Sequence, residues 1–167
     1  MKPEAVDAII EGLKEAGIDF IASLPSTGTR DSIKIIMNDP DFQHVPVHNE
    51  GSGIAICAGA YLGGKTPALL AENSGLVLGA YSLMGIEYYL AGTPLLMVLD
   101  HRGDFGDGGG YFYYGGRLVE PLLDVFRIPY NIVRDYRKFK SAIIQGQKTT
   151  EAYGKPAAVL VSGEDVW

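Results

Sequence analysis

Glu50 is the residue of this sequence whose type and position point most directly to chemistry. It follows a short β-rich run, Val45 to His48, and precedes a run of small residues that favours a helix. Ligands of open α/β sheets bind at the carboxyl ends of the strands. A carboxylate at such an end, beside Gly51 and Gly53, which let a flat ligand approach the backbone, indicates proton chemistry on a bound cofactor. The alternative is an acid in the first turn of a helix, stabilised by about 0.3–1 kcal/mol through the helix dipole.

Polar side chains also follow three other predicted strands. Carboxyl ends of parallel strands open on one edge of a sheet, so these loops are expected to meet the Glu50 loop. Together they supply a carboxylate, hydroxyls, an amide, an imidazole and a guanidinium. The loops are Pro25-Ser26-Thr27-Gly28, Glu72-Asn73-Ser74-Gly75-Leu76 and His101-Arg102-Gly103-Asp104.

Arg102 is the cation best suited to bind an anionic ligand at this edge. A guanidinium matches the geometry of a sulfonate, phosphonate or carboxylate. The same side chain has three acidic neighbours in the sequence, Asp100, Asp104 and Asp107, and a salt bridge to one of them explains it equally well.

Each of the remaining candidates has a functional and a structural interpretation. His48 either orients Glu50 and contacts substrate, or is a structural histidine at a strand end. Ser26 and Thr27 either face the site or serve the turn that follows the strand. The segment Asn73 to Gly75 either presents helix amides to an anion or is a plain N-cap.

The elements that position these residues alternate along the chain. Amphipathic segments are expected as helices, and apolar runs bounded by glycine, proline or polar residues as strands. Helices are expected at 3–16, 31–38, 50–63, 74–91, near 117–126 and at 138–153, strands at 18–24, 43–48, 66–71, 94–100, 128–133 and 156–161, and a long loop at 101–116.

This order predicts the fold class. Six strands joined by crossover helices favour an α/β fold with a doubly wound, mainly parallel six-stranded sheet and helices on both faces. Leu95 to Leu99 is apolar throughout, as a strand buried on both faces should be. The length of 167 residues fits a single domain, 1–167.

Composition and charge exclude several classes of function. The net charge is −6, and no basic stripe with interleaved aromatics is present, so we expect no nucleic-acid partner. No apolar run reaches the ~18 residues that span a bilayer, and the N-terminus lacks a signal-peptide core, so we expect no membrane and a cytoplasmic protein. The lone Cys57 is expected in the core.

The ordered set of motifs resembles one family. The chain is similar to the α subunit of sulfopyruvate decarboxylase and to phosphonopyruvate decarboxylase, which are thiamine-diphosphate enzymes. The stretches that carry the resemblance are Gly17 to Phe20, the segment ending in Glu50, Ile56 to Lys65, Asn73 to Leu76, His101 to Gly103 and Ile128 to Tyr130. They match the pyrimidine-binding domain of these enzymes, and Val77-Leu78 replaces the Gly-Asn pair that the family commonly has there.

The resemblance implies roles for the strand-end residues. Glu50 would be catalytic, hydrogen-bonding a ring nitrogen of the cofactor aminopyrimidine and so activating the cofactor. Cofactor-binding residues would be Pro25, Glu50, Asn73, Ser74 and Gly75. Substrate-binding residues would be Ser26, Thr27, His48 and Arg102, acting on a small anionic 2-oxo acid such as 3-sulfopyruvate or 3-phosphonopyruvate.

The resemblance also implies that half of the site is missing from this chain. Such enzymes need a diphosphate-binding domain with a Gly-Asp-Gly motif at a strand end. Gly106-Asp107-Gly108 is rejected as that motif, because His101 to Phe105 separate it from the preceding strand, and no metal ligand is expected here. A β subunit would hold the diphosphate and Mg²⁺, giving a hetero-oligomer of α and β chains.

Two alternatives to the decarboxylase remain. The partner chain could direct the site to a different 2-oxo acid or to a carboligation. The chain could instead be a non-catalytic binding or regulatory subunit of the same fold.

Overall fold

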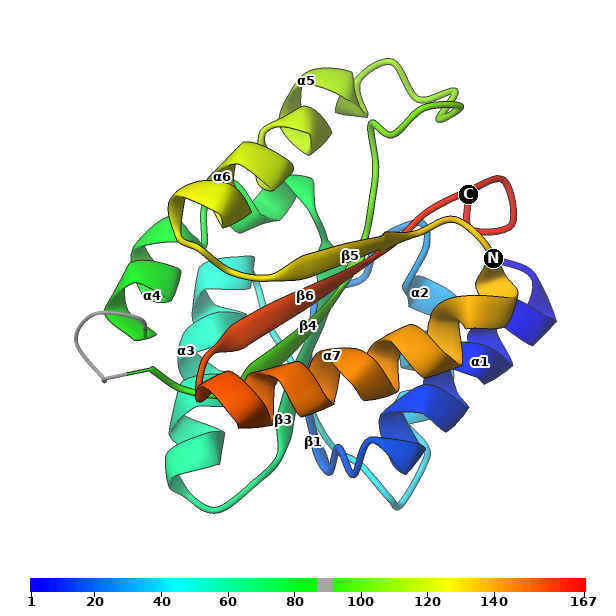
Figure 1. The fold of residues 1–167 in the computed structure, drawn as a ribbon. Helices are drawn as coiled ribbons and strands as arrows, with labels where there is room; N and C mark the ends of the chain where they lie inside the picture. The colour runs from blue at the N-terminus through cyan, green and yellow to red at the C-terminus, as the bar shows by residue number, and fades with distance from the viewer. Residues whose placement is uncertain (87–91) are drawn as a thin grey trace.

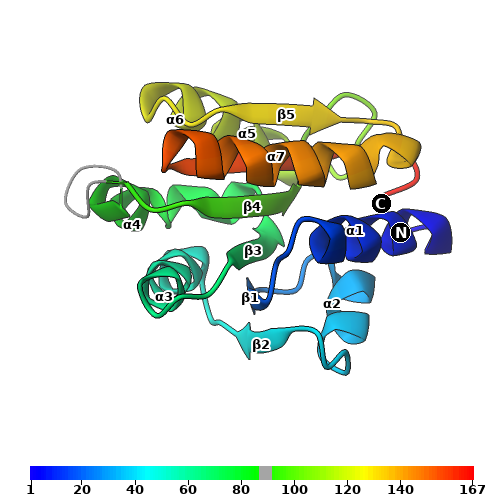
Figure 2. The same cartoon turned by 60° about the horizontal axis from the view of Figure 1, so that its bottom comes forward.

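The computed structural model describes residues 1–86 and 92–167, and it confirms the predicted α/β fold. Six strands form one sheet in the order β2-β1-β3-β4-β6-β5, and every neighbouring pair is parallel. Figure 2 shows β2 and β5 at the two ends of the sheet. The strands are β1 (Phe20–Ser23), β2 (Gln43–Pro46), β3 (Pro67–Glu72), β4 (Leu95–Asp100), β5 (Tyr130–Val133) and β6 (Pro156–Val161).

Helices cover both faces of the sheet, as Figure 1 shows. One core cluster joins the sheet to α1, α2 and α7, and a second joins the opposite face to α3, α4 and α6. The helices are α1 (Pro3–Glu15), α2 (Arg30–Ile36), α3 (Glu50–Leu62), α4 (Ala80–Met84), α5 (Phe112–Arg117), α6 (Val119–Val125) and α7 (Phe139–Tyr153).

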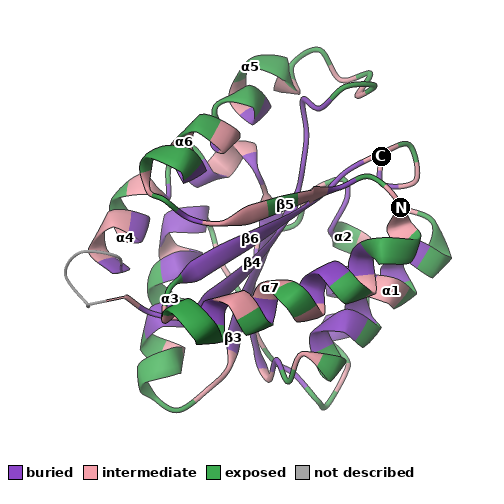
Figure 3. Cartoon of the chain, in the orientation of Figure 1, coloured by how far each residue is buried: buried purple, intermediate pink, exposed green. Residues whose placement is uncertain are grey.

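The central strands are buried from end to end. Figure 3 shows β4 and β6 in the colour of buried residues, and every residue of both strands is buried. In β4, Leu96 and Val98 belong to one core cluster, whereas Leu95, Met97 and Leu99 belong to the other. Successive side chains of a strand point to opposite faces. A strand buried on both faces therefore needs the uninterrupted apolar run that the sequence shows.

The ends of α1 and α7 follow the local signals in the sequence. Proline occupies the first turn of α1, where its missing N–H costs no hydrogen bond. Gly17 follows this helix with a φ of 73°, and Gly154 ends α7 with a φ of 65°. Glycine adopts this left-handed conformation without the steric cost that other residues pay.

The continuous helix predicted over 74–91 is wrong for the part of it that the structure describes. That part contains a short 3₁₀ helix, η1 (Ser74–Val77), followed by α4, while residues 87–91 of the prediction lie outside the described residues. Gly79 separates the two, and a Cβ there would lie 2.6 Å from Ile54 Cδ1 of α3. Close packing on α3, together with the low helix propensity of glycine, thus interrupts the helix.

The long loop predicted over 101–116 is wrong for its last five residues, 112–116. Residues Phe112–Arg117 form α5, and the helix expected near 117–126 is α6, Val119–Val125. Among the described residues, no helix combines the length and the apolar character that crossing a bilayer requires.

Candidate active site

Glu50 occupies the first position of α3, at the carboxyl edge of the sheet. Asn49 caps the helix, because its side-chain oxygen accepts a hydrogen bond from the Ser52 amide at 2.8 Å. The Glu50 side chain is only 4% exposed. Its carboxyl group lies directly against Gly75 of η1, where any Cβ would overlap the Glu50 Oε1 and Cδ atoms. The loops after β2 and β3 therefore meet at this carboxyl group.

The surroundings of Glu50 favour its protonated form. Burial raises the pKa of this carboxyl above its usual range, the negative charge of Glu72 adds to the effect, and a hydrogen bond from the Glu50 amide opposes it. Within residues 1–86 and 92–167, the carboxyl has no ion-pair partner and no hydrogen bond from another residue. A buried, unpaired carboxyl with a raised pKa is suited to exchange a proton with a bound ligand.

Gly75 is the predicted cofactor-binding residue that the structure brings to Glu50, whereas Asn73 and Ser74 make other contacts. Asn73 is fully buried, and its amide group donates to the carbonyl oxygens of Arg102 (3.0 Å) and Gly116 (3.3 Å) and accepts from the Arg102 amide (3.1 Å). The Ser74 hydroxyl donates to Glu72 Oε1. Asn73 thus joins the end of β3 to the loop after β4.

The helix terminus predicted at Asn73 to Gly75 is replaced by the four-residue η1. Asn73 occupies its N-cap position, but its side chain makes no capping hydrogen bond. This segment thus contains neither a long helix nor a side-chain cap by Asn73, and its predicted role in binding the cofactor stays a prediction.

The loop after β1 contains Pro25, Ser26 and Thr27, and the structure places Thr27 beside Arg102. Ser26 Oγ lies 2.8 Å from Thr29 Oγ1 and accepts a hydrogen bond from the Thr29 amide, which is the turn role considered for this residue. Thr27 Oγ1 accepts a hydrogen bond from Arg102 Nη1 at 3.0 Å. Pro25 is exposed.

Arg102 is buried and already paired with one of its acidic neighbours. Its Nε and Nη2 atoms donate to the two carboxylate oxygens of Asp107 at 2.8 and 3.0 Å. Its guanidinium carbon lies 3.8 Å from the centre of the Phe112 ring. Asp107 also accepts from the amides of Gly103 and Gly109, so it folds the loop around the guanidinium. The aspartate of the rejected Gly-Asp-Gly motif therefore binds an arginine.

His48 lies apart from Arg102 in the hydrogen-bond network. The His48 side chain is exposed, and its Nε2 atom is 3.3 Å from Ser52 Oγ in the first turn of α3. No hydrogen bond joins His48 to Glu50 in the described part of the chain.

Sequence reasoning named Asp100 only as a neighbour of Arg102, although it is a central residue of this edge. It ends β4, is fully buried, and pairs in register with Glu72. Its Oδ2 atom accepts a hydrogen bond from the Gly28 amide at 2.7 Å. Burial raises the pKa of Asp100 to about 6, against the lowering effect of the Gly28 amide. The signal in the sequence was an acid that directly follows the apolar run 95–99.

Asp104, in the same loop after β4, connects this loop to residues that follow β5 and β6. Asp104 accepts two hydrogen bonds from Arg134, at 2.7 and 2.8 Å, and one from the Ser162 hydroxyl. Burial alone would raise the pKa of Asp104, but these hydrogen bonds and one from the Phe105 amide lower it to about 2. The ends of β4, β5 and β6 are thereby joined.

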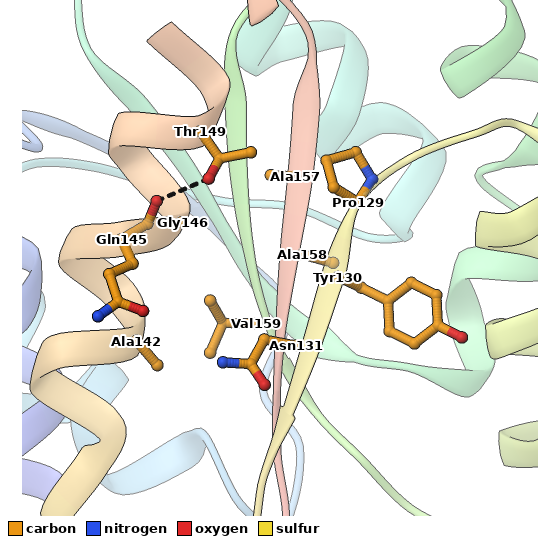
Figure 4. Close-up of a pocket in the computed structure, with 10 residues that line it drawn as sticks. All are labelled: Pro129, Tyr130, Asn131, Ala142, Gln145, Gly146, Thr149, Ala157, Ala158 and Val159. Carbon is orange, nitrogen blue, oxygen red and sulfur yellow. Dashed lines mark hydrogen bonds between the residues drawn. The ribbon is translucent and has the colours of Figure 1, made fainter. Parts of the chain in front are cut away.

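A groove of about 140 Å³ lies elsewhere on the molecule, between α7 and the strands β5 and β6. Figure 4 shows Gln145 and Thr149 of α7 on one side of it and Pro129 and Tyr130 on the other. None of the predicted site residues lines this groove.

The comparisons with known proteins assign the family. The chain is 32% identical over 161 residues to the sulfopyruvate decarboxylase subunit alpha of Methanothermobacter thermautotrophicus, covering 96% of this chain and 97% of the relative. It is 37% identical over 122 residues to the subunit of the same name from Methanocaldococcus jannaschii, covering 73% of this chain and 72% of the relative. A phosphonopyruvate decarboxylase of Streptomyces viridochromogenes is 27% identical over 76% of this chain and 32% of its own length.

A solved structure supports the fold. The 2-oxoglutarate:ferredoxin oxidoreductase of Magnetococcus marinus superposes on 98% of this chain with a TM-score of 0.73 and 23% identity, and the match spans 29% of that larger protein. No protein-family model matches the sequence. The alignment with the Methanothermobacter subunit covers nearly both full lengths, so this chain belongs to the family of sulfopyruvate decarboxylase alpha subunits and phosphonopyruvate decarboxylases.

Proposed function

We propose that this chain is the α subunit of a thiamine-diphosphate-dependent decarboxylase that acts on a 3-substituted pyruvate. The substrate class, 3-sulfopyruvate or 3-phosphonopyruvate, follows from the names of the relatives. The observation that carries the proposal is the Glu50 carboxyl, which is buried, unpaired among the described residues and in contact with Gly75. Residues 1–167 would form a single pyrimidine-binding domain.

The residues around Glu50 fit an aminopyrimidine ring. When bound, thiamine diphosphate supplies an electron sink for the electron pair that loss of CO₂ leaves on a 2-oxo acid. Glu50 would hold a proton at its carboxyl and share it with a ring nitrogen of the pyrimidine. Burial of Glu50 raises its pKa, which favours the carboxyl form that carries this proton. The absence of a side chain at Gly75 leaves room for the carboxyl in this position.

The charges at this edge favour a diphosphate site on another chain. The negative charge of Glu72 acts on both Glu50 and Asp100. Arg102, the cation beside them, is already paired with Asp107. Because acidic groups repel a diphosphate, we propose that a β subunit holds the diphosphate and Mg²⁺. The name "subunit alpha" of the relatives supports a second type of chain.

The substrate anion would lie near the loop after β1 and Arg102, which the Thr27 hydrogen bond holds together. Arg102 keeps two N–H donors beyond the three used by Asp107 and Thr27, because a guanidinium has five. We propose that Arg102 contributes through these donors while Asp107 fixes its plane. His48 is a further proposed contact, from the α3 side of the site.

The proposal is tested by isolating the complex and measuring its dependence on the cofactor. The tagged chain is purified from its native cells, and the co-purifying chains are sequenced. We expect a partner with Gly-Asp-Gly at a strand end, and CO₂ release from 3-sulfopyruvate or 3-phosphonopyruvate that requires added thiamine diphosphate and Mg²⁺. A complex that releases no CO₂ from either acid with both cofactors present would contradict the proposal.

A further inference from the structure

Asp100 has a buried carboxyl group that contacts the loop after β1 through the Gly28 amide, and a hydrogen bond from the Ser26 side chain of the same loop also favours its ionised form. Its Oδ2 atom accepts the hydrogen bond from the Gly28 amide at 2.7 Å, across 72 positions of the sequence. Its Oδ1 atom is buried and has no hydrogen-bond partner in the part of the chain that the structure describes. A buried polar atom without a partner is costly, so its retention calls for a functional reason.

The loop after β1 is packed directly onto this carboxyl group. A Cβ at Gly28 would lie 2.6 Å from Asp100 Cγ and 2.7 Å from Val166 Cγ1, so only glycine fits between the aspartate and the C-terminal segment. The contact therefore depends on the backbone of Gly28, and its hydrogen bond links the loop directly to the last residue of β4.

A second contact attaches the same loop to the residue two places after Asp100. Arg102 Nη1 donates to Thr27 Oγ1 at 3.0 Å, next to the Gly28 amide that Asp100 holds. Within the loop, Ser26 and Thr29 hydrogen-bond each other. The loop is thus held at two consecutive residues. The Asp100 carboxylate holds Gly28, and the Arg102 guanidinium holds Thr27.

We propose that Asp100 is a positioning residue whose carboxylate holds the loop 25–29 in place at the substrate end of the site, and that proton uptake by Asp100 loosens this loop. The statement about substrate rests on the proposed function, whereas the attachment of the loop does not. A carboxylate accepts a hydrogen bond about twice as strongly as a neutral acceptor, so protonation weakens the bond from Gly28.

The charged groups around Asp100 place this change in an accessible pH range. Glu72 of β3 faces it in the register of the sheet and disfavours its ionisation, whereas Arg102 favours it. Burial is the largest effect and raises the pKa of Asp100 to about 6. The loop should therefore be held firmly above about pH 7 and less firmly below about pH 5.

The attachment itself is tested on the isolated chain by NMR. The ¹H–¹⁵N signal of the Gly28 amide is followed from about pH 4.5 to 7.5. We expect a downfield shift as pH rises, with a midpoint near the Asp100 pKa, and a flat profile in Asp100→Asn. The control Asp41→Asn, at an exposed residue before β2, should keep the wild-type profile. A Gly28 signal that does not titrate, or that titrates equally in Asp100→Asn, would overturn the proposal.

The consequence for substrate is tested on the α–β complex. Asp100→Ala should raise KM for the 2-oxo acid roughly tenfold while changing kcat much less, because a hydrogen bond to a charged group is lost away from the reacting atoms. Asp100→Asn, whose neutral amide oxygen still accepts from Gly28 but more weakly than a carboxylate, should recover only part of this loss and give a KM that no longer changes with pH. An equal loss of kcat in both variants, with KM unchanged, would contradict the positioning role.

The two tests separate the inference from the proposed function. If the wild-type complex shows no thiamine-diphosphate-dependent activity, the decarboxylase assignment fails, yet the Gly28 titration still decides whether Asp100 holds the loop. If the complex is active and the Gly28 titration is absent, the Asp100 inference alone fails.

Discussion

The carboxyl group of Glu50 fills the position that a side chain at Gly75 would take. This relationship joins the loop after β2 to the loop after β3, and it fixes the carboxyl without an ion pair. The carboxyl is consequently shielded from water but still able to exchange a proton.

Gly75→Ala should therefore disable the site through its neighbour. The new methyl group displaces the Glu50 carboxyl, and we expect a loss of CO₂ release of at least ~10²-fold, because small displacements of reacting groups have effects of this size. Steady-state assays of the complex measure it. Gly59→Ala is the matched control, since a Cβ there meets no atom within 4 Å. Equal activity of the two variants would show that the contact with Gly75 is unimportant.

Arg102→Lys should loosen the loop after β4. Lysine cannot form the two-pronged pair with Asp107 or stack its plane on Phe112. We expect faster chymotrypsin cleavage after Phe105, which is 95% exposed, by roughly tenfold in the isolated chain. Arg137→Lys, at a pair that is mostly exposed, serves as the control. Cleavage at the wild-type rate in Arg102→Lys would contradict this role of the Asp107 pair.

Asp104 should stabilise the fold in the acid range. Its pKa is about 2 in the folded chain and near 3.9 in the unfolded chain, so its contribution is complete above about pH 4 and is lost as pH falls towards 2. Asp104→Asn should lower the free energy of unfolding at pH 7 by about 1–2 kcal/mol, because the Arg134 partner is half exposed and water screens the pair. Urea unfolding at pH 7 and pH 2.5 measures both values. A difference between variant and wild type that does not shrink at the lower pH would refute the assignment.

Asp100 should have the opposite pH dependence. Its pKa is about 6 when folded, so the folded chain binds the proton more tightly than the unfolded chain, and stability falls as pH rises from about 4 to 6. Relative to wild type, Asp100→Asn should therefore become more stable on going from pH 4.5 to pH 7.5, by about 2 kcal/mol. Thermal or urea unfolding at the two pH values provides the comparison. A constant difference would mean that Asp100 titrates normally.

The sequence was sufficient for the sheet and for the position of Glu50 at the start of α3, because both depend on local signals. Apolar runs such as Leu95 to Leu99 identify buried strands, and a carboxylate at a strand-to-helix junction is visible without tertiary contacts. The break in the helix predicted over 74–91 was missed because it depends on the packing of Gly79 against Ile54. That contact joins two segments whose proximity the local pattern does not encode.

The roles of the acids after β4 also depended on distant partners. Asp100 acts on Gly28, and Asp104 on Arg134, so neither role can be read from the surrounding residues. For Arg102 the sequence left three aspartates open as partners, and the fold of the loop selects Asp107. Its proposed contact with substrate remains a prediction.

The Glu50→Gln variant in the reconstituted α–β complex tests most directly whether Glu50 activates the cofactor. Glutamine keeps the shape of the side chain but cannot hold an exchangeable acidic proton. We expect a loss of thiamine-diphosphate-dependent CO₂ release of at least ~10²-fold, with an unchanged circular dichroism spectrum and unchanged assembly. Glu15→Gln, at an exposed site in α1, should retain wild-type turnover. Near-normal CO₂ release by Glu50→Gln would contradict the claim that Glu50 activates the cofactor.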